Sequence, residues 1–245
     1  MRHILITLAF MACISPAMAQ YWSMGLRTGI GMYSMKDLDE FQELRRQESG
    51  LPLKTTESYP VSPNYRIELV YNSQRFISKA GFFYTFNSTG ARSTVSDYSG
   101  RYDLDAIING NQLGLTFEHL LDVKHYLGYG VYADGNFSWT RLRTLDFFQI
   151  VFPGNITYKY EYDFRAMGFS SEWGLYLQYT YGHLRARFNI GYLLDYSSGL
   201  HLAEDKNLWL VLDNEKLRPQ WDGLRIGLQV DILFKGAPAR VKRNE

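Results

Sequence analysis

The sequence predicts an all-β fold, an eight-stranded antiparallel up-and-down transmembrane β-barrel with long extracellular loops and short periplasmic turns. Three observations lead to this prediction. Nearly every segment after Gln20 alternates apolar with polar or small residues, which is the period of a β-strand. Eight such segments fit in the chain, and bacterial membrane barrels have an even number of strands. The connections alternate between short and long, as they do in those barrels.

The first and last strands alternate most regularly. The first is expected from Trp22 to about Tyr33 and the last from Leu224 to Phe234. Six further strands are expected over residues 65–71, 76–86, 109–119, 125–139, 167–179 and 183–196.

The connections predict which end of the barrel faces out of the cell. The short turns are residues 72–75, 121–124 and 180–182, and the long loops are 34–64, 87–108, 140–166 and 197–222. Short turns belong to the periplasmic end of such barrels. Within the first long loop, residues 37–48 read as a short amphipathic helix that packs against the barrel rim, with a partner-binding or plug helix as the alternative. In the last, residues 208–212 read as either a strand that extends the barrel or an exposed recognition edge.

The composition excludes several classes of protein. The 245 residues are 46% hydrophobic and 21% charged, and 26 Lys and Arg balance 25 Asp and Glu. A nucleic-acid-binding protein would carry a basic surplus, so we expect no nucleic-acid partner. An acidic disordered chain would have fewer aromatic residues. Beyond residue 19 no apolar run approaches 18 residues, which excludes transmembrane helices.

Residues 1–19 read as a secretory signal peptide. A basic n-region precedes an apolar run over 4–14, and a small-residue cleavage site ends at Ala19, so we expect cleavage before Gln20. A short membrane anchor is the alternative, but the run is too short to span a bilayer. The one cysteine, Cys13, lies inside this run, so the mature chain needs no disulfide.

The polar face of the strands is expected inside the barrel. It is thinly charged, whereas the water-exposed face of a soluble barrel, the alternative, would carry many more Lys and Glu. Its charges also balance, as a confined interior requires. An eight-stranded barrel is just wide enough for side chains to fill, so we expect a closed, charge-filled interior. The predicted interior residues are Arg27, Arg66, Lys79, Arg185, Arg187 and Arg225 against Glu68, Glu118, Asp134, Glu172, Asp195 and Asp231.

Aromatic residues near the strand ends suit the interfacial girdles of a membrane barrel. They are Trp22, Tyr71, Phe76, Phe117, Trp139, Tyr179, Tyr196, Trp221 and Phe234.

With a cleavable signal, eight alternating strands and a last strand ending in an aromatic residue, the chain resembles the small outer-membrane β-barrel superfamily. Its members include the OmpA transmembrane domain, OmpX and the PorT-like "outer membrane protein beta-barrel domain" proteins. The resemblance covers residues 20–234 and implies a location in the bacterial outer membrane, in contact with its lipid. The alternation of Val230, Ile232 and Phe234 resembles the signal read by the barrel-assembly machinery. The chain departs from the pattern in a polar tail, residues 235–245, expected in the periplasm.

No catalytic, cofactor or metal site is expected. Barrel enzymes that act on outer-leaflet lipid need a His beside a Ser or an acid at the outer rim. His119, His125 and His183 fall at the short-turn end, and His201 is the one loop histidine. Ser and acidic residues near His201 make a general base conceivable, but loop composition explains them equally well. Two acid groups, Asp37, Asp39, Glu40 and Glu43, and Asp97, Asp103 and Asp105, could bind a divalent ion, but they follow no EF-hand pattern and read as solvated loop residues.

The function expected is that of a non-enzymatic surface barrel whose outer loops bind a partner or help to structure the envelope. Tyr158, Tyr160 and Tyr162 in these loops suit binding. The alternative is a PorT-like accessory barrel of a protein secretion or gliding machine, with contacts through the periplasmic turns and the 235–245 tail. A lipid-modifying enzyme is a more distant third.

Overall fold

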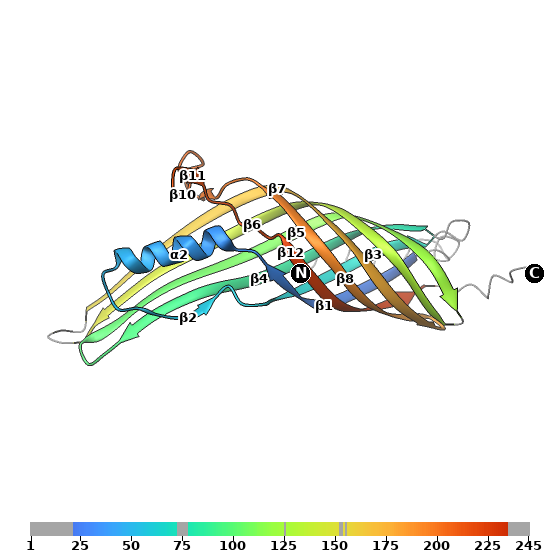
Figure 1. Cartoon of the computed structure of the whole chain (residues 1–245), viewed down its shortest axis with the longest axis horizontal. Coiled ribbons are helices and arrows are strands. Elements are labelled where there is room, and N and C mark those ends of the chain that lie inside the picture. The colour runs from blue at the N-terminus through green and yellow to red at the C-terminus, as the bar shows by residue number, and fades with distance from the viewer. Residues whose placement is uncertain (1–21, 73–77, 125, 152–153, 155, 235–245) are drawn as a thin grey trace, which may run out of the picture.

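The computed structural model describes residues 22–72, 78–124, 126–151, 154 and 156–234. Eight antiparallel strands close into a ring in chain order, with the last strand paired to the first (Figure 1). This confirms the predicted eight-stranded up-and-down barrel. The ring comprises β1 (Trp22–Tyr33), β3 (Ser62–Asn72), β4 (Ser78–Ser96), β5 (Gly100–Lys124), β6 (Leu127–Ile150), β7 (Ile156–Tyr181), β8 (Leu184–Ser197) and β12 (Gly223–Leu233).

Five shorter elements complete the described part of the fold. They are α2 (Lys36–Glu48), β2 (Lys54–Ser58), β9 (His201–Leu202), β10 (Val211–Leu212) and β11 (Glu215–Lys216). Among the described residues no helix has the length and apolar character needed to cross a membrane.

The prediction of long loops is wrong for two of the four segments, because most of their residues belong to strands. The segments 87–108 and 140–166 continue the β4–β5 and β6–β7 hairpins, which reach well past the other strands (Figure 1). Charged residues appear on the outward face there and form cross-strand ion pairs, although Ile107, Leu145 and Phe147 also face outward. Arg92 lies 2.7 Å from Asp105, and Arg141 lies 2.8 Å from Asp163. The predicted turn 121–124 is likewise part of β5.

The predicted helix in the first connection is confirmed as α2. Acids stand in its first turn and Arg45 and Arg46 in its last, which complements the helix dipole. Its buried residues, Leu38 and Gln42, face the extended sheet, where Gln42 Nε2 donates a 3.0 Å hydrogen bond to the carbonyl oxygen of Leu104.

A hydrophobic cap packs between α2, the 198–221 segment and the inner face of the extended strands. It places an apolar core at the end of the barrel opposite the short turns, instead of in the lumen. The cap consists of Met35, Leu38, Tyr59, Ala91, Ala106, Ile108, Leu142, Ala166, Leu193, Leu200, Leu217 and Trp221.

The 208–212 segment adds no strand to the ring, although Trp209 forms an isolated antiparallel bridge with His201 of β9, which pairs with β7. β10 pairs only with β11 in a separate two-stranded sheet within the described structure. Leu210 and Leu212 pack against the cap, while Leu208 is 56% exposed and Val211 is 50% exposed.

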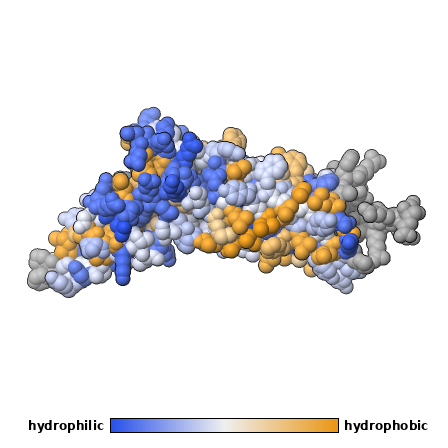
Figure 2. All heavy atoms as spheres, viewed as in Figure 1, coloured by the Kyte–Doolittle hydropathy of each residue, from blue (hydrophilic) through white to orange (hydrophobic). Residues whose placement is uncertain are grey.

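The outer surface of the barrel is apolar. Figure 2 shows hydrophobic side chains gathered on the barrel half of the molecule and hydrophilic ones over α2 and the β10–β11 hairpin. A contiguous apolar surface of this extent is not normally left facing water. It includes Leu26, Ile67, Phe82, Leu115, Phe117, Val131, Phe169, Trp173, Leu175, Leu184, Phe188, Leu228, Val230 and Ile232.

Candidate functional site

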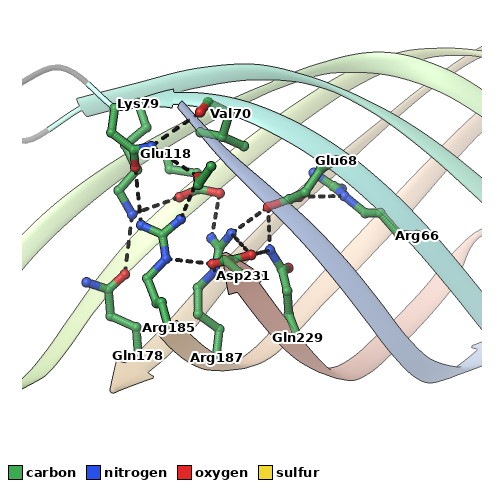
Figure 3. Close-up of polar contacts among 12 residues, drawn as sticks. Arg66, Glu68, Val70, Lys79, Glu118, Gln178, Arg185, Arg187, Gln229 and Asp231 are labelled. Carbon is green, nitrogen blue, oxygen red and sulfur yellow. Dashed lines mark hydrogen bonds and ion pairs between the residues drawn. The ribbon is translucent and has the colours of Figure 1, made fainter. Parts of the chain in front are cut away.

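The lumen of the barrel holds a network of buried ion pairs (Figure 3). Strand alternation sends these side chains inward, and each is at most 9% exposed. The pairs are Arg27–Glu172 (3.3 Å), Arg66–Glu68 (2.9 Å), Arg66–Asp134, Lys79–Glu118 (3.2 Å), Arg185–Asp231 (2.6 Å), Arg187–Glu68, Arg187–Glu118, Arg187–Asp231 (3.0 Å) and Arg225–Glu172 (2.8 Å).

Arg187 is the centre of one layer of this network. From β8 its guanidinium reaches Glu68 on β3, Glu118 on β5 and Asp231 on β12, so one cation joins carboxylates from three other strands (Figure 3). Gln229 joins the same layer, where its Nε2 donates to Asp231 Oδ1 at 2.6 Å and also to Glu68.

Glu172 is the centre of a second layer. It accepts hydrogen bonds from Arg225 at 2.8 Å and from the Tyr132 hydroxyl at 2.6 Å, and it pairs with Arg27. Arg225 also donates to Gln112 Oε1 at 3.0 Å. The sequence reasoning missed such uncharged partners, although they lie on the same alternating face as the charges.

Asp195 is not part of this network. Its carboxylate accepts from the Ser197 hydroxyl at 2.6 Å and from the Trp221 backbone N–H at 3.2 Å. The expected balance of six acids against six bases therefore becomes five against six within the network. The physical reason is position, because Asp195 stands near the end of β8, where the 198–222 segment folds back over the barrel.

Trp221 closes the lumen from above, and its predicted place in an interfacial girdle is wrong. The residue is 1% exposed, its Nε1 donates to Thr140 Oγ1 at 2.9 Å, and its ring meets Tyr33 edge-on at 5.0 Å. Gly110 makes room for the indole, since a Cβ there would lie 2.8 Å from the ring. Residues that precede β12 turn inward here because they bridge the polar lumen and the apolar cap.

The predicted assembly signal lies at the end of β12. Val230, Ile232 and Phe234 all face outward and are about half exposed, and the Phe234 N–H donates to the Trp22 carbonyl at 3.1 Å. The predicted signal peptide and the 235–245 tail lie outside the described residues.

The histidines contact neighbouring side chains and the backbone. His201 Nδ1 is buried without a hydrogen-bond partner among the described residues, and its ring packs against Trp209 at 5.5 Å. His119 Nδ1 lies 2.9 Å from the Ser78 hydroxyl, and His183 Nδ1 lies 3.1 Å from the Leu233 carbonyl. His125 and Phe76 lie outside the described residues.

The predicted loop acids lie mostly on α2 and β5, and the prediction that Asp103 and Asp105 are solvated is wrong, because both are buried in ion pairs on β5. Asp103 and Asp105 pair with arginines at 2.7 Å each, and Asp37 accepts from Gln220 at 2.6 Å. Glu43 pairs with Arg46, whose hydrogen bonds hold the pKa of that carboxyl below its usual value. Across the described part of the chain, no three acidic, His or Cys side chains are arranged to hold a metal ion.

An aromatic pocket lies on the extended sheet beyond the cap. Tyr102, Asp146, Phe148, Tyr158 and Tyr160 line about 310 Å³. The strand register places these residues on the inner face of the extended sheet, the same face that α2 covers closer to the barrel. Arg45 of α2 pairs with Asp146 at the edge of the pocket. The Tyr102 and Phe148 rings meet edge-on at 5.7 Å.

No family model matches the chain, and no curated protein matches it. Among solved structures, it is similar to Ail, the attachment invasion locus protein of Yersinia pestis, in complex with the heparin analogue sucrose octasulfate. The two are 10% identical, with 86% of this chain and 93% of that chain covered and a TM-score of 0.29.

Proposed function

We propose that this protein is a non-enzymatic integral barrel of the bacterial outer membrane, with a lumen closed by ion pairs and outer hairpins that bind a partner. The observation that carries the proposal is the inverted polarity of the barrel. Charged side chains fill its interior, while apolar side chains cover its exterior. A soluble barrel has the reverse arrangement, and a closed ring satisfies every backbone group that lipid would leave unpaired.

The end of the apolar surface sets the orientation. On β6 and β7 the outward-facing residues change from Trp139 and Met167 to Arg141 and Arg165. The extended hairpins beyond this step would stand outside the lipid. The opposite end has the short turns, which in such barrels face the periplasm.

Membrane integration has a direct test. The purified chain should need detergent for solubility, migrate differently on a gel before and after heating, and give a strand-rich circular dichroism spectrum. A helical spectrum, or full solubility without detergent, would contradict the proposal.

A closed lumen has a separate test. In planar bilayers the reconstituted protein should give no steady conductance, because the ion pairs and the Trp221 lid fill the interior. A steady, large conductance would show that the barrel is a pore.

The aromatic pocket supports partner binding. Tyr158, Tyr160 and Tyr162 are 48–57% exposed on one strand face, and tyrosines give a large contact area at a low cost in side-chain entropy. We expect Tyr158→Ser with Tyr160→Ser to abolish capture of a partner by intact cells. Lys159→Gln with Thr157→Ser, on the opposite face of β7, is the matched control. Equal capture by both variants would exclude the pocket.

The accessory-barrel alternative depends on the tail. Deleting residues 235–245 should be silent if the outer hairpins carry the function and damaging if the tail docks on a periplasmic machine. Replacing only the exposed tip of the 200–214 segment should have the reverse effect. We also propose that Val230, Ile232 and Phe234 are read by the assembly machinery, so Phe234→Ala should lower the amount of barrel in the membrane.

A further inference from the structure

Two arginines stand directly opposite each other on the outer surface. Arg141 on β6 and Arg165 on β7 are register partners in the antiparallel ladder. Like charges in such positions destabilise a sheet. Their side chains are 48% and 54% exposed, and both turn toward one carboxylate, that of Asp163, at 2.8 Å and 3.8 Å. A single acid thus serves two cations.

The neighbouring residues leave this surface positive. The outward face of the extended β6–β7 hairpin carries Arg141, Arg143, Lys159 and Arg165 against Glu161 and Asp163. On the extended β4–β5 hairpin, Arg92 and Arg101 each have their own acid, Asp105 and Asp103, at 2.7 Å. Of the two extended hairpins, only β6–β7 therefore carries a positive surplus in these ion pairs.

The arginine pair lies at the upper edge of the apolar surface. Trp139 and Met167, also register partners, precede it by two residues on each strand. Trp139 belongs to an aromatic group with Tyr84, Phe137 and Phe169, whose successive ring centroids are 5.7–6.2 Å apart. Such aromatic groups mark the level of the lipid headgroups in membrane barrels.

We propose that Arg141 and Arg165 bind the phosphate group of an outer-leaflet lipid, whose acyl chains lie on Trp139, Met167 and Phe169. Guanidinium groups present paired N–H donors that match phosphate oxygens. An anion between the two side chains would also remove the repulsion that the register creates. The inference rests on the membrane location proposed above.

The experiment measures lipid retention by the full chain in detergent micelles, using native mass spectrometry. The probes are diphosphorylated lipid A, its dephosphorylated form, and inorganic phosphate as competitor. Arg141→Gln with Arg165→Gln is compared with Arg92→Gln plus Arg101→Gln, whose parent side chains are each 52% exposed. At about fivefold per arginine, the first pair should weaken lipid A binding by about 25-fold, and the control pair should not.

A second variant separates a lost site from a lost fold. Asp163→Asn removes the competing carboxylate, so lipid A should bind more tightly than to wild type, which a misfolded barrel could not produce. Equal binding of lipid A by wild type and the Arg141 and Arg165 double variant would overturn the site. Retention of the dephosphorylated lipid equal to that of lipid A by the wild-type chain would also overturn the site. Efficient displacement of lipid A by inorganic phosphate would assign the site to free phosphate instead. A chain that is soluble without detergent and lacks heat-modifiable migration would instead overturn the membrane location.

Discussion

The Trp221 indole joins the two interiors of this molecule through its 2.9 Å hydrogen bond to Thr140 Oγ1. On one side its ring meets Tyr33, whose hydroxyl accepts a 2.9 Å hydrogen bond from Arg225 of the lumen network. On the other side it belongs to the hydrophobic cap. One side chain therefore forms the boundary between a charged lumen and an apolar core.

Removing this lid should be costly. Trp221→Ala leaves a cavity at a fully buried position and is expected to lower the free energy of unfolding by roughly 3–5 kcal/mol. Thr140→Val removes only the hydrogen-bond acceptor and should cost about 1–3 kcal/mol, because the indole N–H is left buried and unpaired. Urea unfolding in lipid vesicles, followed by circular dichroism, measures both. Unchanged unfolding of Trp221→Ala would mean that the Trp221 lid does not stabilise the fold.

The lumen residues could be predicted because the strand period alone decides which side of a sheet a residue faces. Glu68 and Arg187 are 119 residues apart, yet alternation puts each on the polar face of its strand, and the sparse, balanced charge of that face predicts it inside. Their pairing could not be predicted, because it depends on how far neighbouring strands are staggered around the ring. The three acids on Arg187 come from strands that periodicity cannot align.

The extended hairpins could have been recognised, while the cap could not. Residues 158–163 alternate tyrosine with charged residues, which is a strand signal. The charged residues in this segment led to the prediction of a loop instead of a strand. Met35, Leu200 and Trp221 carry no such pattern, because irregular segments bring them together from distant parts of the chain.

Removing the central cation of the lumen should destabilise the barrel strongly. Arg187→Leu leaves Glu68, Glu118 and Asp231 without their shared partner, and breaking a buried pair costs roughly 3–5 kcal/mol. Lys79→Leu is the milder control, since Lys79 pairs with Glu118 alone among those acids and Glu118 would keep Arg187. The urea midpoint of the reconstituted protein should fall much further for Arg187→Leu. Equal midpoints would show that no residue is central to the network.

Gln220 should control the order of α2. Met35 precedes the helix without a side-chain cap, and Gln220 supplies one from the 198–222 segment. Its Oε1 accepts from the Asp37 N–H at 3.1 Å and its Nε2 donates to Asp37 Oδ1 at 2.6 Å. Gln220→Ala should raise hydrogen exchange in α2, with a local loss of about 1 kcal/mol.

The backbone at Gln220 provides the control. Its φ of 52° is left-handed, a conformation that costs roughly 1–2 kcal/mol for a residue with a Cβ. Gln220→Gly loses the same cap but relieves this cost, so α2 should exchange more slowly in it than in Gln220→Ala. Wild-type exchange in both variants would show that the cap does not hold the helix.

The tip of the β4–β5 hairpin should loosen in acid. Asp97 Oδ1 accepts from the Ser99 N–H at 2.8 Å, the Ser99 hydroxyl at 2.6 Å and the Gly100 N–H at 3.2 Å. These bonds favour the charged carboxylate and hold its pKa below the usual range. A lowered folded pKa means that the stabilisation is complete above the unfolded pKa of about 3.9 and is lost as the pH falls through the folded value. Amide shifts of Ser99 and Gly100, followed by NMR in micelles, should therefore titrate with a midpoint below about 3.9.

In Asp97→Asn the amide oxygen can still accept these bonds, so the titration should vanish while the turn persists. A midpoint at or above about 4 would mean that the carboxylate gains nothing from the turn.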